Sequence, residues 1–287
     1  MIVLDTRGCY WRSCYMCGYN NEEKSDESVL SQIERALMQY KGEEVIKIFT
    51  SGSFLDTKEI SREERMKIFE ALPDVDITIE TRPEFVTEKA LEDLKGRSVE
   101  IAIGLESASD EVLHDCVNKG FSVSDFLKAA KKIREKKLRV KAYLLLKPPF
   151  LSENEALEDL KRSIDFCANC ADTISINPVN VQKGTTVEKL WFEGRYRPPW
   201  LWSLVDALIY SQRYLEKTIV TSMPAGGGSR RGVHNCFSCD REILKVIDRC
   251  RISQDYEALQ DLRCECIEKW RDSLDLERYV YGYPLYE

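Results

Sequence analysis

Three cysteines crowd one short segment near the start of the chain. Cys9, Cys14 and Cys17 follow the apolar run Ile2-Val3-Leu4 and span nine residues. Thiolates at this density repel one another unless they are protonated, oxidised or bound to a soft metal. Three sulfurs do not complete a tetrahedral zinc site, whereas an iron-sulfur cluster can be held by three cysteines and keep one iron open for chemistry. The spacing therefore favours a cluster, with half of a zinc site or plain buried thiols as the alternatives.

A second group of cysteines lies near the other end of the chain. Cys236 and Cys239 form one close pair, and Cys264 and Cys266 form another about 25 residues later. Two such pairs around a helix-sized spacer indicate a metal site, because four thiolates complete the tetrahedral set of structural zinc. A second iron-sulfur cluster is the alternative, and His234 could replace one cysteine as a ligand.

The composition narrows the class of protein. Of the 287 residues, 43% are hydrophobic and 32% are charged. We find no long apolar run and no secretory pattern, so we expect a cytoplasmic protein that makes no contact with a membrane. Eleven cysteines in a reducing compartment favour metal binding over disulfides. The net charge of −7 opposes the attraction of a polyanion, so binding of nucleic acid would need a local basic face or a partner.

Apolar, β-rich runs alternate with amphipathic stretches through the first part of the chain. The runs predict six strands, at 2–4, 45–49, 76–81, 99–104, 139–146 and 173–178. Helices are predicted at 25–40, 62–72 and 88–95, from 110, from 122, and from Ser152 to 167. Ser61 with Glu64 and Ser152 with Glu155 form the capping boxes of two of them. The run Leu144 to Leu146 indicates a strand that is buried on both faces, as in a parallel sheet. Six strand-helix units imply an α/β fold with a parallel sheet, closed in part into a (β/α)6 barrel like that of TIM.

The pattern changes after the sixth predicted strand. Residues 191–202 are rich in aromatics and proline, 204–215 have helical spacing, and 223–232 form a basic loop rich in glycine. We therefore predict a barrel domain with its extension over 1–222, and a small metal-binding, cysteine-rich subdomain over 223–287.

Polar side chains follow the predicted strands where the strands would open onto one mouth of the barrel. Active sites of such barrels lie at this end, where carboxylates, amides and cations can hold a cofactor or a substrate. Ion pairs at the rim, solvated lysines and loop caps are the alternatives. The candidate binding residues are Ser51, Gly52, Ser53, Glu80, Arg82, Glu106, Lys147 and Asn177.

Six segments together resemble the radical S-adenosylmethionine (SAM) subunits of archaeosine synthases, within the elongator-like radical SAM superfamily. The resemblance covers nearly the whole chain. The segments are Thr6 to Tyr19, Thr50 to Asp56, Glu80 to Glu84, Leu146 to Phe150, Pro198 to Trp202 and the closing cysteines. The chain departs from the usual pattern in two places: the spacing between Cys9 and Cys14 is one residue longer, and the turn at Gly52 lacks an acidic residue.

The resemblance implies a lyase-type enzyme of tRNA processing. Its expected substrate is an archaeal tRNA whose position-15 base is a 7-deazaguanine carrying lysine, and cleavage of a carbon-nitrogen bond would leave archaeosine. The expected cofactors are a [4Fe–4S] cluster on Cys9, Cys14 and Cys17, SAM, and zinc at the C-terminal cysteines. The turn at Gly52 would bind the SAM amino group, and Glu106 is our first choice for another contact with SAM. A one-electron donor of unknown identity and a lysine-transferring partner subunit are also implied.

Two other functions stay open on the sequence. One is another tRNA modification of the elongator-like group, such as methylthiolation, which a second cluster would favour. The other is a non-catalytic, metal-bound subunit that binds RNA. For contact with tRNA the candidates are Arg195, Arg197, Trp200, Arg230 and Arg231, which combine charge with stacking surface. The alternative is that the aromatics pack the edge of the barrel. We expect this chain alone to bind tRNA weakly, with the partner supplying most phosphate contacts and Arg230 and Arg231 adding a salt-sensitive share.

Overall fold

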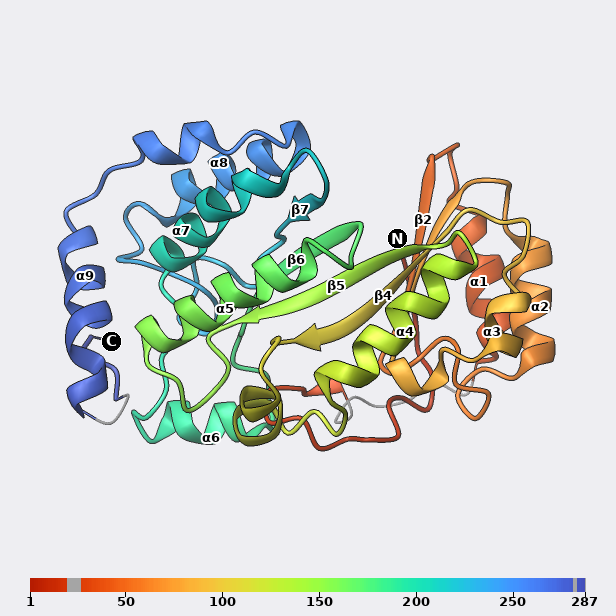
Figure 1. Cartoon of the computed structure of the whole chain (residues 1–287), viewed down its shortest axis with the longest axis horizontal. Coiled ribbons are helices and arrows are strands. Elements are labelled where there is room, and N and C mark those ends of the chain that lie inside the picture. Colours follow the sequence, from red (N-terminus) through yellow and green to blue (C-terminus); the bar gives the residue numbers. More distant parts are fainter. Residues whose placement is uncertain (20–26, 281–282, 287) are drawn as a thin grey trace. The chain divides into compact units, whose positions relative to one another are not determined.

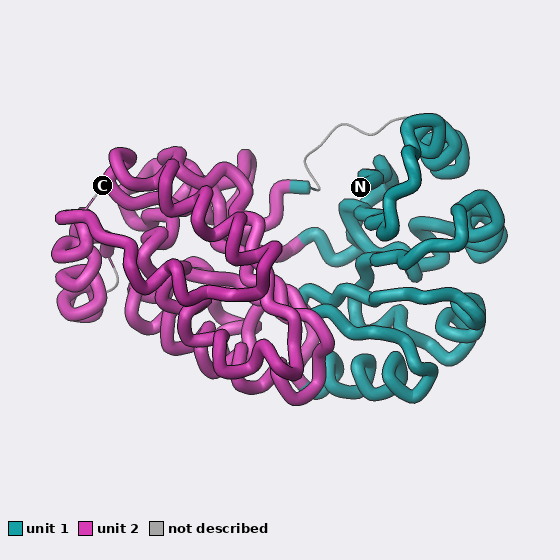
Figure 2. Tube along the Cα trace, turned by 90° about the horizontal axis from the view of Figure 1, so that it is seen from above, with its two compact units in different colours: residues 1–12, 19–104, 124–141 teal, residues 13–18, 105–123, 142–287 magenta. Residues whose placement is uncertain are grey.

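The computed structural model describes residues 1–19, 27–280 and 283–286. The chain forms two compact units (Figure 2). The first comprises residues 1–12, 19–104 and 124–141, and the second comprises 13–18, 105–123 and 142–287. Within the described ranges, no helix has both the length and the apolar character that crossing a bilayer requires.

Among the described residues, seven strands form one sheet in the order of the chain, and Figure 1 shows helices such as α4 and α5 beside its strands. The strands are β1 (Ile2–Leu4), β2 (Val45–Thr50), β3 (Asp76–Thr81), β4 (Val99–Glu106), β5 (Arg139–Leu146), β6 (Thr173–Pro178) and β7 (Ile219–Thr221). Neighbours in sequence are therefore neighbours in the sheet, as expected where helices cross over between parallel strands. The predicted α/β class with a parallel sheet is confirmed. All six predicted strands are present, and the sheet adds a short one, β7, that the sequence analysis did not predict.

The first unit holds the parallel pairing of β1 to β4. Ile2 pairs with Ile48 and Leu4 with Thr50, which sets the end of β1 beside the end of β2. The first unit also contains the helices α1 (Val29–Leu37), α2 (Arg62–Ala71) and α3 (Glu88–Glu92), and most of α4 (Val123–Glu135). The predicted capping box of α2 is confirmed: Ser61 Oγ accepts from Glu64 N, and the Glu64 carboxylate accepts from Ser61 N. The predicted start of α1 at 25 lies outside the described residues.

The second unit pairs β6 with β7 in parallel, Thr173 with Ile219. Ser152 caps α5 with the predicted box to Glu155, and the helix ends at Cys167 as expected. The segment from Asp110 forms a π-helix, η3 (Val112–Val117), which Asn118 ends in the left-handed conformation at φ 55°. The other helices are α5 (Glu153–Cys167), α6 (Thr186–Phe192), α7 (Leu201–Ser211), α8 (Asp240–Ser253) and α9 (Ile267–Leu276).

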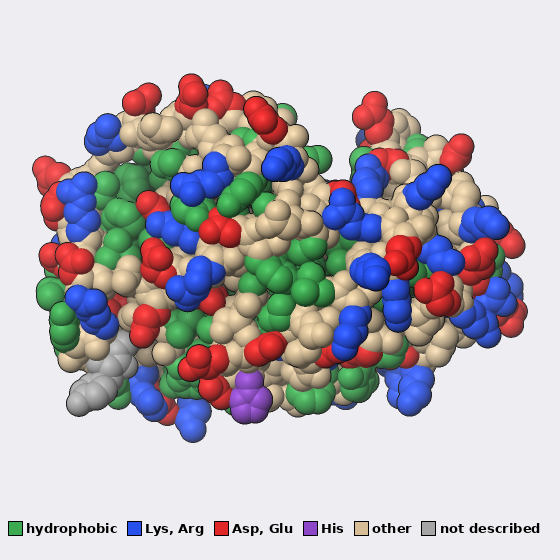
Figure 3. All heavy atoms as spheres, viewed as in Figure 1, with side chains coloured by type: hydrophobic (Ala, Val, Ile, Leu, Met, Phe, Trp, Pro, Cys, Tyr) green, Lys and Arg blue, Asp and Glu red, His purple; other side chains and the backbone are tan. Residues whose placement is uncertain are grey.

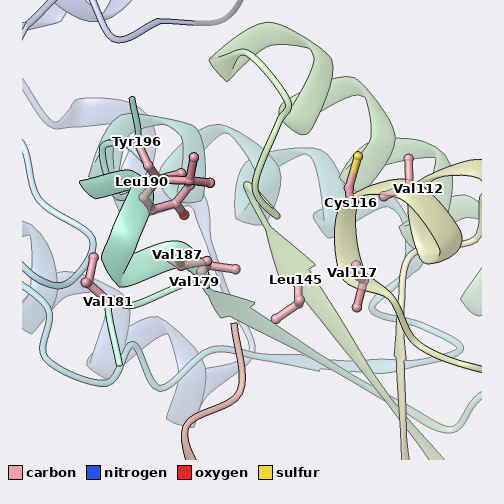
Figure 4. Packing of buried hydrophobic residues seen from close by; sticks show 9 residues of the cluster. All are labelled: Val112, Cys116, Val117, Leu145, Val179, Val181, Val187, Leu190 and Tyr196. Carbon is pink, nitrogen blue, oxygen red and sulfur yellow. The ribbon is translucent and has the colours of Figure 1, made fainter. Parts of the chain in front are cut away.

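A hydrophobic cluster in the second unit fastens α6 to its surroundings. It draws on η3, β5, α6 and the loop after β6 (Figure 4). Its buried members are Val112, Cys116, Val117, Leu145, Val179, Val181, Val187, Leu190 and Tyr196. Met16, from the cysteine segment, and Trp191 pack against it. Because a buried aliphatic side chain contributes roughly 1.5–3 kcal/mol, this cluster fixes one face of α6 firmly.

Three tryptophans join α7 to α9. The indole of Trp200 donates to Ser273, that of Trp202 to the sulfur of Cys266, and that of Trp270 to Ser203. Farther on, Gln254 accepts from Val220 N and donates to Val220 O, so the end of α8 is tied to β7. Residues 223–287 thus belong to the same compact unit as 142–222. A separate subdomain that begins at 223 stays a prediction.

Candidate active site and metal centre

The first part of the cysteine segment turns back on itself, and bonds between its own residues hold the turn. Gly8 has φ 74° and Arg12 has φ 51°, both in the left-handed region. The Arg12 guanidinium donates to the carbonyls of Cys9 and Arg7, at 3.2 and 2.8 Å. The amide of Cys9 donates to Ser51 O at 3.1 Å, which places Cys9 directly against the turn after β2.

Glu59 holds this segment and the turn together, and our sequence analysis missed it. The Thr6 hydroxyl donates to Glu59 Oε1, and the Ser53 amide donates to Glu59 Oε2, each at 2.5 Å. A Cβ atom on Gly52 would collide with both Glu59 Oε2 and Cys9 N, so the turn needs glycine there. Glu59 lies seven residues after Gly52 and outside every motif; its only signal was an acidic residue close behind a candidate binding turn.

The end of β3 joins the same turn. Arg82 N donates to Ser53 Oγ at 3.1 Å, and the buried Arg82 side chain forms an ion pair with Glu84 at 2.6 Å. The Arg82 guanidinium also lies 5.4 Å from the centre of the Tyr10 ring, and Tyr10 donates to Glu84 at 2.7 Å. Although burial opposes the charge, Glu84 raises the pKa of Arg82 above its usual value. Glu80 is half-buried, and its carbonyl accepts from the amide of Phe54.

The second part of the cysteine segment is bound to three other loops of the second unit. Tyr15 N donates to Val117 O, and Tyr15 O accepts from Val187 N at the start of α6. Gly18 N donates to the Gln182 side chain at 2.6 Å. Within the turn, Cys17 N donates to Cys14 O at 3.2 Å. The sulfurs of Cys14 and Cys17 are therefore carried by backbone that is hydrogen-bonded on both sides.

The candidates at the ends of β4 and β5 are buried and paired. Glu106 has φ 72° and forms an ion pair with Lys119 at 2.7 Å. A non-glycine residue in this region costs about 1–3 kcal/mol, which is tolerated where the backbone serves a site. Lys147, with φ 60°, lies 2.7 Å from Glu153 and 3.7 Å from Glu277. At the end of β6, Asn177 is half-buried and bonded to Ser175.

Four cysteine sulfurs come together in the C-terminal part. The Sγ atoms of Cys236, Cys239, Cys264 and Cys266 all lie within 4.8 Å of one another. Three of the separations are 3.7 Å: Cys236 to Cys239, Cys236 to Cys264, and Cys239 to Cys266. Four thiolates at 2.3 Å from one zinc ion stand about 3.8 Å apart. The spacing is thus compatible with one tetrahedral metal ion.

Polar groups around these sulfurs support the same arrangement. The Trp202 indole donates to Cys266 Sγ at 3.3 Å, and the Asn235 amide to Cys239 Sγ at 3.5 Å. Burial raises the pKa of Cys239 to about 11; for Cys236 burial acts in the same direction, but amides of Cys239 and Ser238 lower its pKa to about 7. His234 instead contacts Gly232 O through Nδ1 and stacks on Phe237. Among the described residues, the group of close ligand atoms contains the four sulfurs and no histidine.

Comparison with known proteins shows which family the chain belongs to. Residues 3–163 match the model of the Radical SAM superfamily. The archaeosine synthase subunit beta of Methanosarcina acetivorans is 42% identical over 99% of this chain and 87% of its own length. That of Thermococcus kodakarensis is 42% identical over 94% of this chain and 89% of its own length. The chain belongs to the archaeosine synthase subunit beta family of radical SAM proteins.

A solved structure agrees with this family's fold. The archaeal Elp3 of Methanocaldococcus infernus, lacking its N-terminus, has a TM-score of 0.57 and 21% identity. The match covers 83% of this chain and 60% of the Elp3 chain. At 21% identity, this likeness concerns the fold alone.

The residues present fit the cluster that radical SAM proteins carry. The described cysteines form no disulfide, and Cys9, Cys14 and Cys17 are each partly exposed on one segment. Three thiolate donors leave one iron of a four-iron cluster open. Cys9 belongs to the first unit and the other two to the second, and each part is fixed by its own hydrogen bonds.

The candidates for RNA contact lie in different surroundings. Arg197 and Trp200 are buried, with the guanidinium 4.0 Å from the centre of a Trp200 ring and hydrogen-bonded to His234 O. Their burial agrees with the alternative in which they pack the fold. Arg195 is exposed beside Glu193, Arg230 is exposed, and Arg231 is half-buried. On the face seen in Figure 3, acidic and basic side chains are mixed.

Proposed function

We propose that this radical SAM protein acts on archaeal tRNA and makes archaeosine. The substrate would be the lysine-bearing 7-deazaguanine at position 15, and the reaction would cleave a carbon-nitrogen bond. The observation that carries the proposal is a cysteine segment bound through Glu59 to the turn after β2, in a chain 42% identical to archaeosine synthase subunits beta over nearly its whole length. The chain would therefore be a lyase-type subunit of that synthase.

In this proposal each cofactor has its own residues. Cys9, Cys14 and Cys17 hold a [4Fe–4S] cluster, and the turn Ser51 to Ser53 receives the amino group of SAM. When bound and supplied with one electron by a donor, the two together would release methionine and supply a 5′-deoxyadenosyl radical for removal of hydrogen from the lysyl adduct. The protein's own part is to orient the cofactor and the base and to keep water away. The strand-end residues assigned to this are Glu80, Arg82, Glu106, Lys147 and Asn177.

We assign zinc, rather than a second cluster, to the C-terminal cysteines. A four-iron cluster places each thiolate on a different iron, whereas thiolates that share one ion stand close together. Separations of 3.7 Å support the single ion. Methylthiolation, the other enzyme function we considered, would be favoured by a second cluster, so the spacing also supports archaeosine formation over it.

The relatives are named subunit beta, which supports a partner subunit. We propose that this partner transfers lysine to the base and so prepares the substrate. The one-electron donor stays unassigned.

The decisive test combines anaerobic reconstituted protein, SAM, a reductant and tRNA that carries the lysyl adduct. We expect archaeosine among the digested nucleosides and 5′-deoxyadenosine in the supernatant. The Cys14→Ala variant and tRNA without the adduct are the controls, and neither should give archaeosine. Cleavage of SAM with an intact adduct would contradict the proposed substrate, while archaeosine formed by the Cys14→Ala variant would contradict the proposed cluster.

A further inference from the structure

The C-terminal end of α6 presents an aromatic side chain to solvent. Phe192 is 70% exposed, and the ring of Trp191 lies 5.0 Å from it at an angle of 55°. Trp191 packs against the hydrophobic cluster on its other side. An exposed phenyl ring supported by a second ring is a ready surface for stacking, because each aromatic face is apolar and flat.

Arginine from a distant part of the chain completes this surface. The guanidinium carbon of Arg231 lies 4.8 Å from the Trp191 ring and 5.8 Å from the Phe192 ring. Glu188 holds the guanidinium at 2.8 Å, and Val181 O accepts from it at 3.1 Å. The neighbouring Arg230 is exposed. We call Trp191, Phe192, Arg230 and Arg231 the α6 platform.

The platform stands on a rigid base next to the cysteine segment. Val187 and Leu190, on the inner face of α6, are buried in the cluster shown in Figure 4. The helix is capped by Thr185, whose side chain accepts from Glu188 N. Its first turn is hydrogen-bonded to Tyr15, which lies between Cys14 and Cys17. A molecule stacked on α6 is thus held close to the segment that carries two of the cluster cysteines.

The charge around the platform is opposite to that of the whole chain. Residues 183–195 and 230–231 contain five cations and only two carboxylates, Glu188 and Glu193, although the net charge of the chain is −7. The cations are Lys183, Lys189, Arg195, Arg230 and Arg231. A local excess of this kind attracts a polyanion over the short range that salt screening leaves.

We propose that the α6 platform binds an unpaired nucleotide of RNA. A base stacks on Phe192, and Arg230 and Arg231 contact the phosphates beside it. One ring flanked by cations suits a nucleotide, since a base can stack on a single aromatic face while the cations contact the phosphates. A stable protein interface buries about 1,000 Å² or more and would need a larger apolar area. The proposal rests on the proposed function in one respect, that the RNA is the substrate tRNA.

The test measures the affinity of the full-length chain, without SAM, for a short single-stranded RNA and for an unmodified tRNA transcript. We expect Phe192→Ala to weaken both by about tenfold, and Phe192→Tyr to restore them, because stacking needs a ring. Arg230→Ala should lower the slope of log affinity against log salt by about one. The matched controls on α8 are Ile252→Ala, whose side chain is 72% exposed, and Arg249→Ala, also exposed. Both should bind RNA like the parent.

A photoreactive uridine in the RNA gives a second measurement. Cross-links should fall on the peptide that contains Phe192 and disappear in Phe192→Ala. Equal affinities of Phe192→Ala and Ile252→Ala for RNA would overturn the proposal. So would a Phe192→Ala variant that binds RNA normally but no longer binds the partner subunit. Because binding is measured without SAM, the proposed radical reaction can fail while this result stands, and the reverse also holds.

Discussion

The Glu59 carboxylate accepts one hydrogen bond from the cysteine segment, at Thr6, and one from the turn after β2, at Ser53. Hydrogen bonds to a charged group contribute about 1.5–3 kcal/mol each, so this one side chain can set the distance between two segments that have different tasks. We therefore expect Glu59 to position the two segments relative to each other.

Replacing Glu59 with Gln should therefore loosen the site without unfolding the protein. The amide keeps one acceptor for Ser53 N but presents an N–H to the Thr6 hydroxyl, which must then accept rather than donate, and both contacts lose the carboxylate charge. We expect faster loss of iron from reconstituted protein and about tenfold weaker SAM binding, measured by iron release and by calorimetry. The control is Glu63→Gln on α2, where the carboxylate is 79% exposed and pairs only with Lys67 in the next turn. If the two variants keep iron and bind SAM equally, Glu59 has no positioning role.

The buried ion pairs at the end of β5 link three elements. Lys147 directly follows β5, Glu153 begins α5, and Glu277 follows α9. Burial alone would raise the pKa of Glu153, but Lys147 and Ser203 outweigh it, and the pKa is lowered. The pKa of Glu277, in contrast, is raised by burial. As the pH rises, ionisation of Glu153 therefore stabilises the folded state, whereas ionisation of Glu277 destabilises it.

Glu277→Gln should flatten the pH dependence of stability. A raised pKa in the folded state means that the contribution of Glu277 is fully present below the unfolded pKa and is lost as the pH rises through the folded value. The variant should lose less stability than the parent between mildly acidic and neutral pH, as measured by urea unfolding. Glu153→Gln should cost about 3–5 kcal/mol at neutral pH, because it leaves Lys147 buried without its nearest charge. Equal pH profiles of Glu277→Gln and the parent would show that Glu277 is ionised in both states.

The four cysteines at the start of α8 and α9 bring the N-terminal ends of these two helices together. We expect Cys264→Ser to lower zinc content and to reduce the melting temperature by about 5–10 °C, because an incomplete ligand set no longer holds the helices together. The iron on the N-terminal cysteines should remain. Cys170→Ser is the control, since its hydroxyl can keep the bond that Cys170 makes to Phe166 O. Elemental analysis that finds about eight irons and no zinc would refute this assignment.

Local patterns account for the elements that the sequence predicted well. The capping boxes at Ser61 and Ser152 predicted the starts of α2 and α5, because a capping box depends on two residues three apart in the chain. The run Leu144 to Leu146 predicted a strand that is buried on both faces, and the side chains of all three residues are buried. Contacts between distant residues had no such signal. Glu59, the pairing of Lys119 with Glu106, and the stacking of Arg231 on Trp191 arise only when the chain folds.

Over the whole molecule, the acidic net charge sets a limit on how this protein meets tRNA. A chain with charge −7 repels a polyanion at long range, so contact depends on local cations such as those of the α6 platform. We expect the isolated chain to bind tRNA weakly and the lysine-transferring partner to supply most phosphate contacts. Binding measured against salt should give a shallow slope for the chain alone and a steeper one for the complex. Nanomolar binding by the isolated chain, unaffected when both Arg230 and Arg231 become Ala, would contradict this.

The fluorescence of the indoles between α7 and α9 can report on the candidate metal site at the C-terminal cysteines. Trp202 donates directly to a cysteine sulfur, and Trp200 and Trp270 bridge the same two helices. Indole emission responds to the polarity and the quenching groups around the ring, and three of the chain's five tryptophans lie here. Removal of the ion with a chelator should therefore change the protein's intrinsic fluorescence. That signal would give a continuous optical record of occupancy at the C-terminal site, independent of iron at the N-terminal cysteines.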